Sequence, residues 1–138
     1  MLWGAHILFT LGVVSFFTVD PIVLTLAAFL SVVPDLDKPI KHRAWFSHSI
    51  YAAIIFSIVG YLASDYNVTY AIVVFLAVST HVLMDFVTKS GVPILHPWKK
   101  KHYGLRLVAA HDGKSNRAFI LLGLIMLLYN LCVAYPVL

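Results

Sequence analysis

Long apolar runs separated by short polar breaks are the main pattern of this chain. The runs cover about residues 2–18, 21–34, 48–64, 68–88 and 118–136. A helix needs about 20 apolar residues to cross the hydrocarbon core of a bilayer, so the run at 21–34 is the weakest candidate. The pattern predicts an all-α integral membrane bundle of about five transmembrane helices, or four if residues 21–34 do not cross.

The polar breaks contain signals for helix boundaries. Asp20-Pro21 combines an N-cap residue with a proline at the first helical position, and Ser47 can cap the run that begins at residue 48. The two longer polar stretches, 35–47 and 89–117, are predicted loops. No linker or internal repeat divides the chain, so we expect a single membrane-embedded domain over residues 1–138.

The composition agrees with a membrane protein. Hydrophobic residues make up 61% of the chain and charged residues 12%, whereas soluble domains carry about 25% charged residues. All six acidic residues are aspartates, and in so apolar a chain each one needs a partner or a function. The first run lacks the basic leader and the cleavage site of a signal peptide, so we treat it as a retained span.

The basic residues determine the predicted orientation. All ten Lys and Arg residues lie in the 35–47 loop or the 89–117 loop, and the positive-inside rule places such loops in the cytoplasm. Five spans then give a multi-pass protein of the cell membrane with a cytoplasmic N-terminus. This orientation accounts for the net charge of +4, so we expect membrane lipid, and no nucleic acid, as the partner.

The same orientation gathers the remaining polar residues at one end of the bundle. Asp20 and Asp65 lie at the opposite turns, where aspartate is an ordinary residue. Every histidine and every other aspartate falls at the cytoplasmic end, namely His6, Asp35, Asp37, His42, His48, His81, Asp85, His96, His102, His111 and Asp112.

His81 and Asp85 are the first candidate pair. They are four residues apart in the fourth run, so a helix places them on one face. A carboxylate within the hydrocarbon region is costly unless it is paired or bound to a metal. The pair is therefore a candidate for metal binding, and a hydrogen bond between helices is the alternative.

Asp35 and Asp37 form a second candidate group within Pro34-Asp35-Leu36-Asp37. In an irregular loop both carboxylates can turn towards one cation, and a bound dication removes their mutual repulsion. His48 and His6 complete the candidate ligand set. Turn or capping roles for the aspartates, and packed positions for the histidines, are the alternatives.

The residue types also indicate the chemistry. Mixed histidine and aspartate ligands suit a divalent metal ion, with zinc favoured and manganese or iron as alternatives. An open position on such an ion holds a water of lowered pKa, which can attack a phosphoryl or acyl centre. Arg43 is a candidate clamp for a substrate phosphate, and His42 beside it can support a ligand or carry a proton.

Together these motifs resemble the YdjM-type family of predicted membrane-bound metal-dependent hydrolases. Ser47 stands where that family usually has threonine, and His6 matches its early histidine. The resemblance covers about residues 6–97 and implies metal-dependent hydrolysis, with a distant similarity to the zinc-dependent phospholipase C and nuclease group. It rests on Pro34-Asp35-Leu36-Asp37, His42-Arg43 with Ser47-His48-Ser49, His81-x-x-x-Asp85, and Gly91-Val92-Pro93 with Pro97.

We therefore expect a membrane-bound metal-dependent hydrolase, a phosphoesterase that acts on a lipid or lipid-linked substrate at the cytoplasmic face. Arg43 and His42 are its expected substrate-binding residues, and His6 is a further metal ligand. A metal-independent lipid phosphatase is one alternative, although the residues before His81 lack the Ser-Arg that such enzymes use. A non-enzymatic metal-binding or transport protein is another. The expected catalytic and metal-binding residues are Asp35, Asp37, His48, His81 and Asp85.

Overall fold

The computed structural model describes residues 1–37, with the side chain of Asp37 excepted, and residues 46–135. Over these residues the chain is helical and has no β-strand beyond two isolated β-bridges. Two short 3-10 helices, η1 (Val33–Asp37) and η2 (Phe46–His48), lie between the second and third α-helices. The α-helices are α1 (Trp3–Val14), α2 (Pro21–Leu30), α4 (Ile50–Ala63), α5 (Val68–Val87) and α6 (Gly113–Ala134).

The helices differ in length. Within the described part of the chain only α5 and α6, of 20 and 22 residues, are long and apolar enough to cross a membrane. Helices α1, α2 and α4 have 12, 10 and 14 residues, and at 1.5 Å per residue even α4 extends only about 21 Å, against a hydrocarbon core of about 30 Å. The all-α class is therefore confirmed, whereas a bundle of four to five complete spans is not.

Side-chain caps explain where the helices begin. Asp20 caps α2, Ser49 caps α4, Asn67 caps α5 and Asp112 caps α6. The start of α2 at Pro21 is as predicted. Two predicted boundaries are wrong, because Ser49 rather than Ser47 caps α4, and because the Asp112 cap lets α6 begin at Gly113 instead of residue 118.

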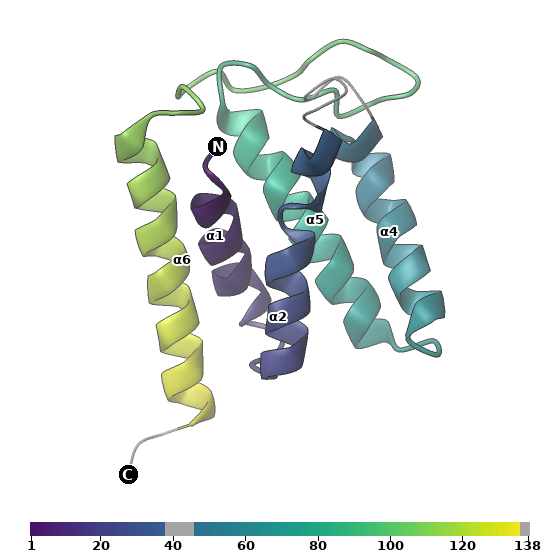
Figure 1. Ribbon diagram of the computed structural model, residues 1–138, viewed down its shortest axis with the longest axis vertical. Coiled ribbons are helices and arrows are strands. Elements are labelled where there is room, and N and C mark those ends of the chain that lie inside the picture. Colours follow the sequence, from purple (N-terminus) through teal and green to yellow (C-terminus); the bar gives the residue numbers. More distant parts are fainter. Residues whose placement is uncertain (38–45, 136–138) are drawn as a thin grey trace.

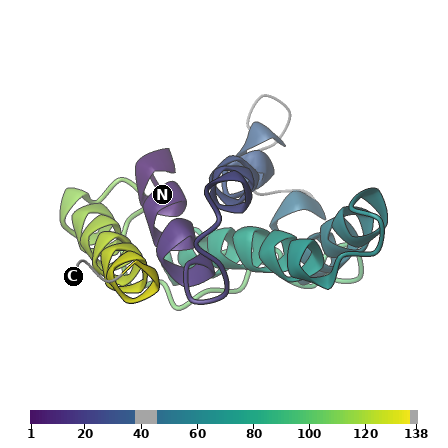
Figure 2. The ribbon, with the colours of Figure 1, turned by 90° about the horizontal axis from the view of Figure 1, so that it is seen from below.

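Helix α5 lies at the centre of the bundle. It packs against α1, α2 and α4, and α6 packs on α1 at the edge (Figure 1). Viewed from below, α2 stands on one side of the layer that the other helices form (Figure 2). The α1–α6 contact is close because it is made at Gly12 and Gly123, and a Cβ atom at Gly123 would collide with the backbone of Leu8.

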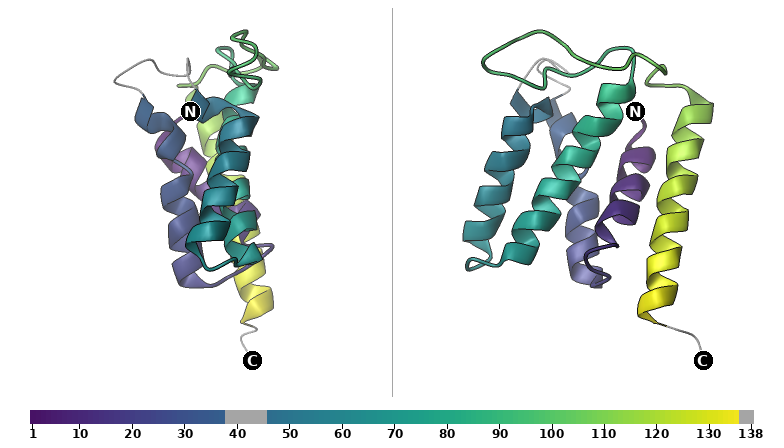
Figure 3. Two further views of the ribbon diagram at one scale, coloured as in Figure 1. Left: turned by 90° about the vertical axis from the view of Figure 1, so that its right-hand side faces the viewer. Right: turned by 180° about the vertical axis from the view of Figure 1, so that it is seen from behind.

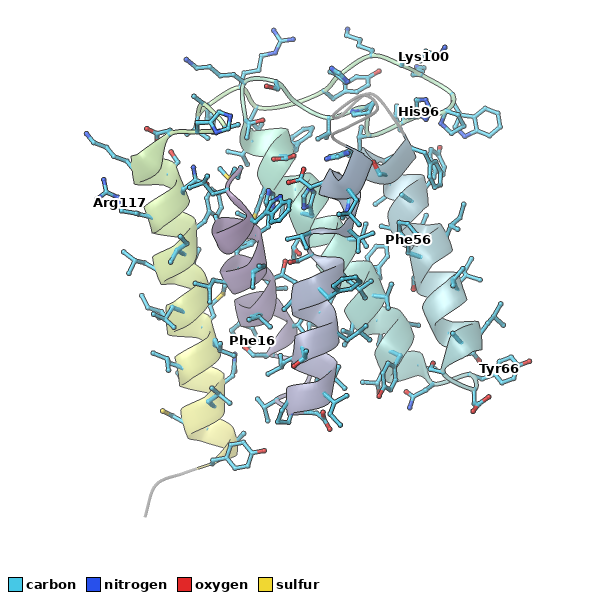
Figure 4. All side chains as sticks on the ribbon, in the orientation of Figure 1. Phe16, Phe56, Tyr66, His96, Lys100 and Arg117 are labelled. Carbon is cyan, nitrogen blue, oxygen red and sulfur yellow. The ribbon has the colours of Figure 1, made fainter. Side chains whose placement is uncertain are left out.

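Because successive helices alternate in direction, the bundle has two distinct ends (Figure 3). The N-terminus, η1, η2 and the loop 88–112 lie at one end, called here the site end. The turns 15–20 and 64–67 lie at the other, called here the far end. Figure 4 shows His96 and Lys100 on the loop at the site end and Tyr66 at the far end.

Candidate metal centre

Four side chains converge at the site end although they come from three separate elements. Asp35 lies in η1, His48 in η2, and His81 and Asp85 one turn apart on α5. One ligand atom from each of the four lies within 4.8 Å of the others. All four residues are buried, with at most 2% of any residue exposed. The structure thus joins the two candidate groups that the sequence places in different motifs.

The donor atoms lie close enough together to share one metal ion. The Nε2 atoms of His48 and His81 are 3.4 Å apart. Each of these atoms is 3.7 Å from Oδ1 of Asp35 and 3.7 Å from Oδ2 of Asp85. A zinc ion with bonds of about 2.1 Å holds its four donors about 3.4 Å apart. Two imidazoles and two carboxylates at this spacing could therefore hold a divalent metal ion.

Neighbouring groups orient the donors. The Nδ1 atom of His81 lies 2.6 Å from the carbonyl oxygen of Ser31, and because a carbonyl can only accept, Nδ1 carries the proton and Nε2 offers its lone pair to the centre. Nδ1 of His48 lies 3.0 Å from the hydroxyl of Ser47. Such contacts hold metal-binding imidazoles in one tautomer and one orientation.

Trp3 orients the side chain of Asp35 in the same way. Its indole Nε1 donates a hydrogen bond of 2.9 Å to Oδ2 of Asp35, which directs the other oxygen, Oδ1, towards His48 and His81. The sequence predicted neither this contact nor the contact of His81 with the Ser31 carbonyl. Neither contact has a local signal, because each joins residues about 30 or more positions apart.

His6 lies beside the centre but outside the four-atom group. Its ring is stacked on that of His81, with centroids 3.9 Å apart, and its Nε2 is 3.6 Å from Oδ1 of Asp85. The amino group of Met1 contacts the same oxygen at 2.9 Å. His6 therefore faces the side of Asp85 that is turned away from His48, and its predicted role as a ligand stays a prediction.

The other predicted site residues are Asp37, His42 and Arg43. The side chain of Asp37, and residues His42 and Arg43 as a whole, lie outside the described residues, so their predicted roles stay predictions. His111 is exposed at the end of the loop, and Asp112 caps α6.

The helical fold and the buried Asp and His side chains define a class of protein, a helical membrane protein with a candidate metal centre. The chain belongs to the YdjM inner membrane protein family, whose model matches residues 1–137. This match confirms the family expected from the motifs and extends it over nearly the whole chain. No curated protein and no solved structure matches the chain.

Proposed function

We propose that this protein is a metal-dependent phosphoesterase that hydrolyses a lipid or lipid-linked substrate at the surface of the inner membrane. The observation that carries the proposal is the convergence of Asp35, His48, His81 and Asp85, with ligand atoms within 4.8 Å of one another, in a buried site. Nitrogen and oxygen donors without cysteine favour zinc, with manganese or iron as alternatives. Such an ion, when bound, lowers the pKa of a water and polarises a phosphoryl oxygen.

The chain's own residues supply the setting for that chemistry. Asp35 and Asp85 offset the charge of a dication, and the contacts from Trp3 and Ser31 hold the donors in place. Burial of all four side chains strengthens their electrostatic interaction with bound charge. On sequence grounds we assign Asp37 as a further ligand, Arg43 as the clamp for the substrate phosphate, and His42 as its neighbour in proton transfer.

The test combines metal analysis with an activity screen. Purified protein should contain near-stoichiometric zinc, manganese or iron, and should hydrolyse phosphorylated lipids in a manner abolished by chelator. The double variant His81→Ala, Asp85→Ala should lose both the metal and the activity. His111→Ala is the matched control, because this histidine is exposed. A metal-free preparation with full activity would contradict the proposal.

One observation favours a second candidate, a non-enzymatic metal-binding protein. Four protein donors around one ion are typical of closed structural sites, whereas catalytic zinc sites keep a position for water. Under this alternative the protein would bind metal with the same loss in the double variant, and no phosphorylated lipid would be hydrolysed. The activity arm of the screen therefore separates the two candidates.

The proposed orientation places the site end in the cytoplasm, as the basic loops predict. Single cysteines at Ser90 and Asn67, in a Cys132→Ser background, lie at the site end and the far end respectively. A membrane-impermeant thiol reagent added to intact cells should label the cysteine at position 67 and not the one at position 90. Labelling of position 90 alone would reverse the orientation.

A further inference from the structure

A cleft separates α2 from α4. Both helices pack on α5, and η1 and η2 connect them at the site end (Figure 1). Below these 3-10 helices, a cavity of about 550 Å³ extends towards the far end. Its walls come from α2 and α4, with α5 as the floor: Leu26, Leu30, Phe56, Val59, Tyr70 and Val74.

The stripe of α5 that forms the floor of this cleft also carries the two α5 residues of the candidate metal centre. Val74, Val78, His81 and Asp85 succeed one another at intervals of four, three and four residues, which places them on one stripe of α5. All four are buried. On α2, Leu30 lines the cleft, and the next residue, Ser31, provides the carbonyl that orients His81. The cleft and the centre therefore lie end to end along the same side of α5.

A second apolar groove differs from the α2–α4 cleft in its position relative to the candidate metal centre. It has a volume of about 480 Å³ and is lined by residues that include Phe75, Ser79, Leu83 and Phe86. These positions lie on the opposite side of α5 from His81 and Asp85. A ligand in this second groove would be separated from the candidate centre by α5 itself, whereas a ligand in the α2–α4 cleft would not.

The distance from the metal centre to the far end of the α2–α4 cleft suits a single hydrocarbon chain. From His81 at the centre to Tyr70, which lines the cleft, α5 extends over about 16 Å. One leaflet supplies about half of the 30 Å hydrocarbon core, so the chain of one membrane lipid fits along this length. The lining is apolar until Ser64 and Asp65, which end the cleft at the far turn.

We propose that the α2–α4 cleft binds the hydrocarbon chain of a single-chain lipid phosphate, with its phosphate at the metal centre. This inference rests on the proposed function and adds the substrate class. The substrate enters sideways from the bilayer between α2 and α4. His48, His81 and the two aspartates would hold the metal ion that binds its phosphate. Because polar residues end the cleft, chains longer than the cleft gain nothing further in affinity.

The first test measures binding without hydrolysis. Single cysteines replace Val59 in the cleft and Ile58 on the other side of α4, in a Cys132→Ser background, and each carries a bimane label. The protein is placed in nanodiscs containing a small fraction of hexadecyl phosphate brominated near the chain end. Quenching should be stronger at position 59 than at position 58, and unlabelled hexadecyl phosphate should remove the excess. Farnesyl phosphate as competitor shows whether a polyprenyl chain occupies the same cleft.

The opposite results of that test overturn the inference. Equal quenching at the two positions would show random contact with lipid. Equal quenching by brominated phosphatidylcholine at position 59 would show that bulk lipid fills the cleft. A quench that depends on protein concentration and not on the lipid phosphate would show that a second copy of the chain covers it.

The second test separates the cleft from the chemistry. Val59→Trp places an indole in the cleft. Ile58→Trp is the matched control, because Ile58 is as exposed as Val59 but does not line the cleft. For hexadecyl phosphate, Val59→Trp should raise KM about tenfold, the change expected when roughly two methylene groups are kept out of an apolar site. For butyl phosphate, kcat/KM should be unchanged in both variants. If the wild type shows the quenching at position 59 but no hydrolysis, the proposed function is refuted and lipid binding in the cleft is supported. If hydrolysis is unaffected by Val59→Trp, lipid binding in the cleft is refuted and the proposed function is retained.

Discussion

Aspartate is used at both ends of the bundle, but in different ways. At the far end, the carboxylate of Asp20 accepts hydrogen bonds from the backbone N–H groups of Ile22 and Val23 and so begins α2. At the site end, Asp85 is fully buried and faces His48 and His81 at 3.7 Å. The carboxylate of Asp20 accepts hydrogen bonds from residues next to it in the chain, whereas the carboxylate of Asp85 belongs to a centre formed by segments that are distant in the chain.

The difference has an energetic meaning. A capping carboxylate remains in contact with water and uses backbone donors that every helix leaves open. Two buried carboxylates close to each other repel, and they are stable together only when a cation or hydrogen bonds offset their charge. Burial of Asp35 and Asp85 beside two histidines is therefore a feature that metal binding explains and that helix formation does not.

The most severe test of this comparison replaces one carboxylate at each end by its amide. Asp85→Asn should reduce metal affinity by more than about 100-fold, since the loss of a direct ligand exceeds the effect of losing a supporting contact. Asp20→Asn should leave the metal content unchanged, because asparagine is an equally good N-cap. Elemental analysis of the two purified variants gives the result, and equal metal content in both would remove the distinction between the ends.

Removal of the metal is expected to have the next largest effect. A ligand that binds only the folded state stabilises it by about 2.7 kcal/mol when its free concentration is 100 times Kd. Chelator should therefore lower the thermal unfolding midpoint of the wild type and leave that of Asp85→Asn unchanged. Readdition of zinc should restore the wild-type midpoint, and a wild type that is insensitive to both treatments would contradict metal binding.

The sequence predicted the site end better than it predicted the helices. The pair His81 and Asp85 was readable because four residues make one helical turn, and the convergence with Asp35 and His48 followed from alternating helices that return to the same end. The lengths of the first three spans were overestimated, and for the first of them the reason is physical. Residues such as Phe16 and Phe17 are apolar and exposed, so hydropathy continues where α1 has already ended at Val14.

The contacts that orient the metal-donor atoms could not be predicted from the sequence. Trp3 and the Ser31 carbonyl act across the fold, and a backbone carbonyl has no residue type by which it can be recognised. His6 was predicted at the correct end of the bundle, but the sequence did not show which oxygen of Asp85 its ring would face. Only the packing of α1 against α5 determines that.

Trp3 allows a third test, of moderate size, that asks whether the site end depends on such distant support. Trp3→Phe removes the hydrogen bond to Asp35 and keeps an aromatic ring, so metal affinity should fall about tenfold, the lower range for loss of a supporting contact. Trp98→Phe is the matched control, because this indole is 77% exposed on the loop. Competition with a chromophoric chelator measures both metal affinities. An equal change in the two variants would show that the hydrogen bond from Trp3 to Asp35 does not support metal binding.

Asp112 provides the smallest and most discriminating test, because it lies at the site end but acts as Asp20 does at the far end. Its carboxylate accepts hydrogen bonds from the hydroxyl and the backbone N–H of Ser115. The hydrogen bond from the Ser115 hydroxyl is the largest of the causes that hold the pKa of Asp112 below its ordinary value. A carboxyl with a lowered folded-state pKa contributes stability above its unfolded pKa and loses it as the pH falls through its folded pKa.

Acidification below about pH 4 should therefore reduce the protection of the first-turn amides of α6 against hydrogen exchange, relative to the rates of an unstructured peptide. Asp112→Ala should show the reduced protection already at neutral pH and lose this acid dependence. Its metal content at neutral pH should equal that of the wild type, because the carboxylate is committed to Ser115. Metal loss in Asp112→Ala would mean that position in the bundle, rather than burial among distant partners, decides which aspartates serve the centre.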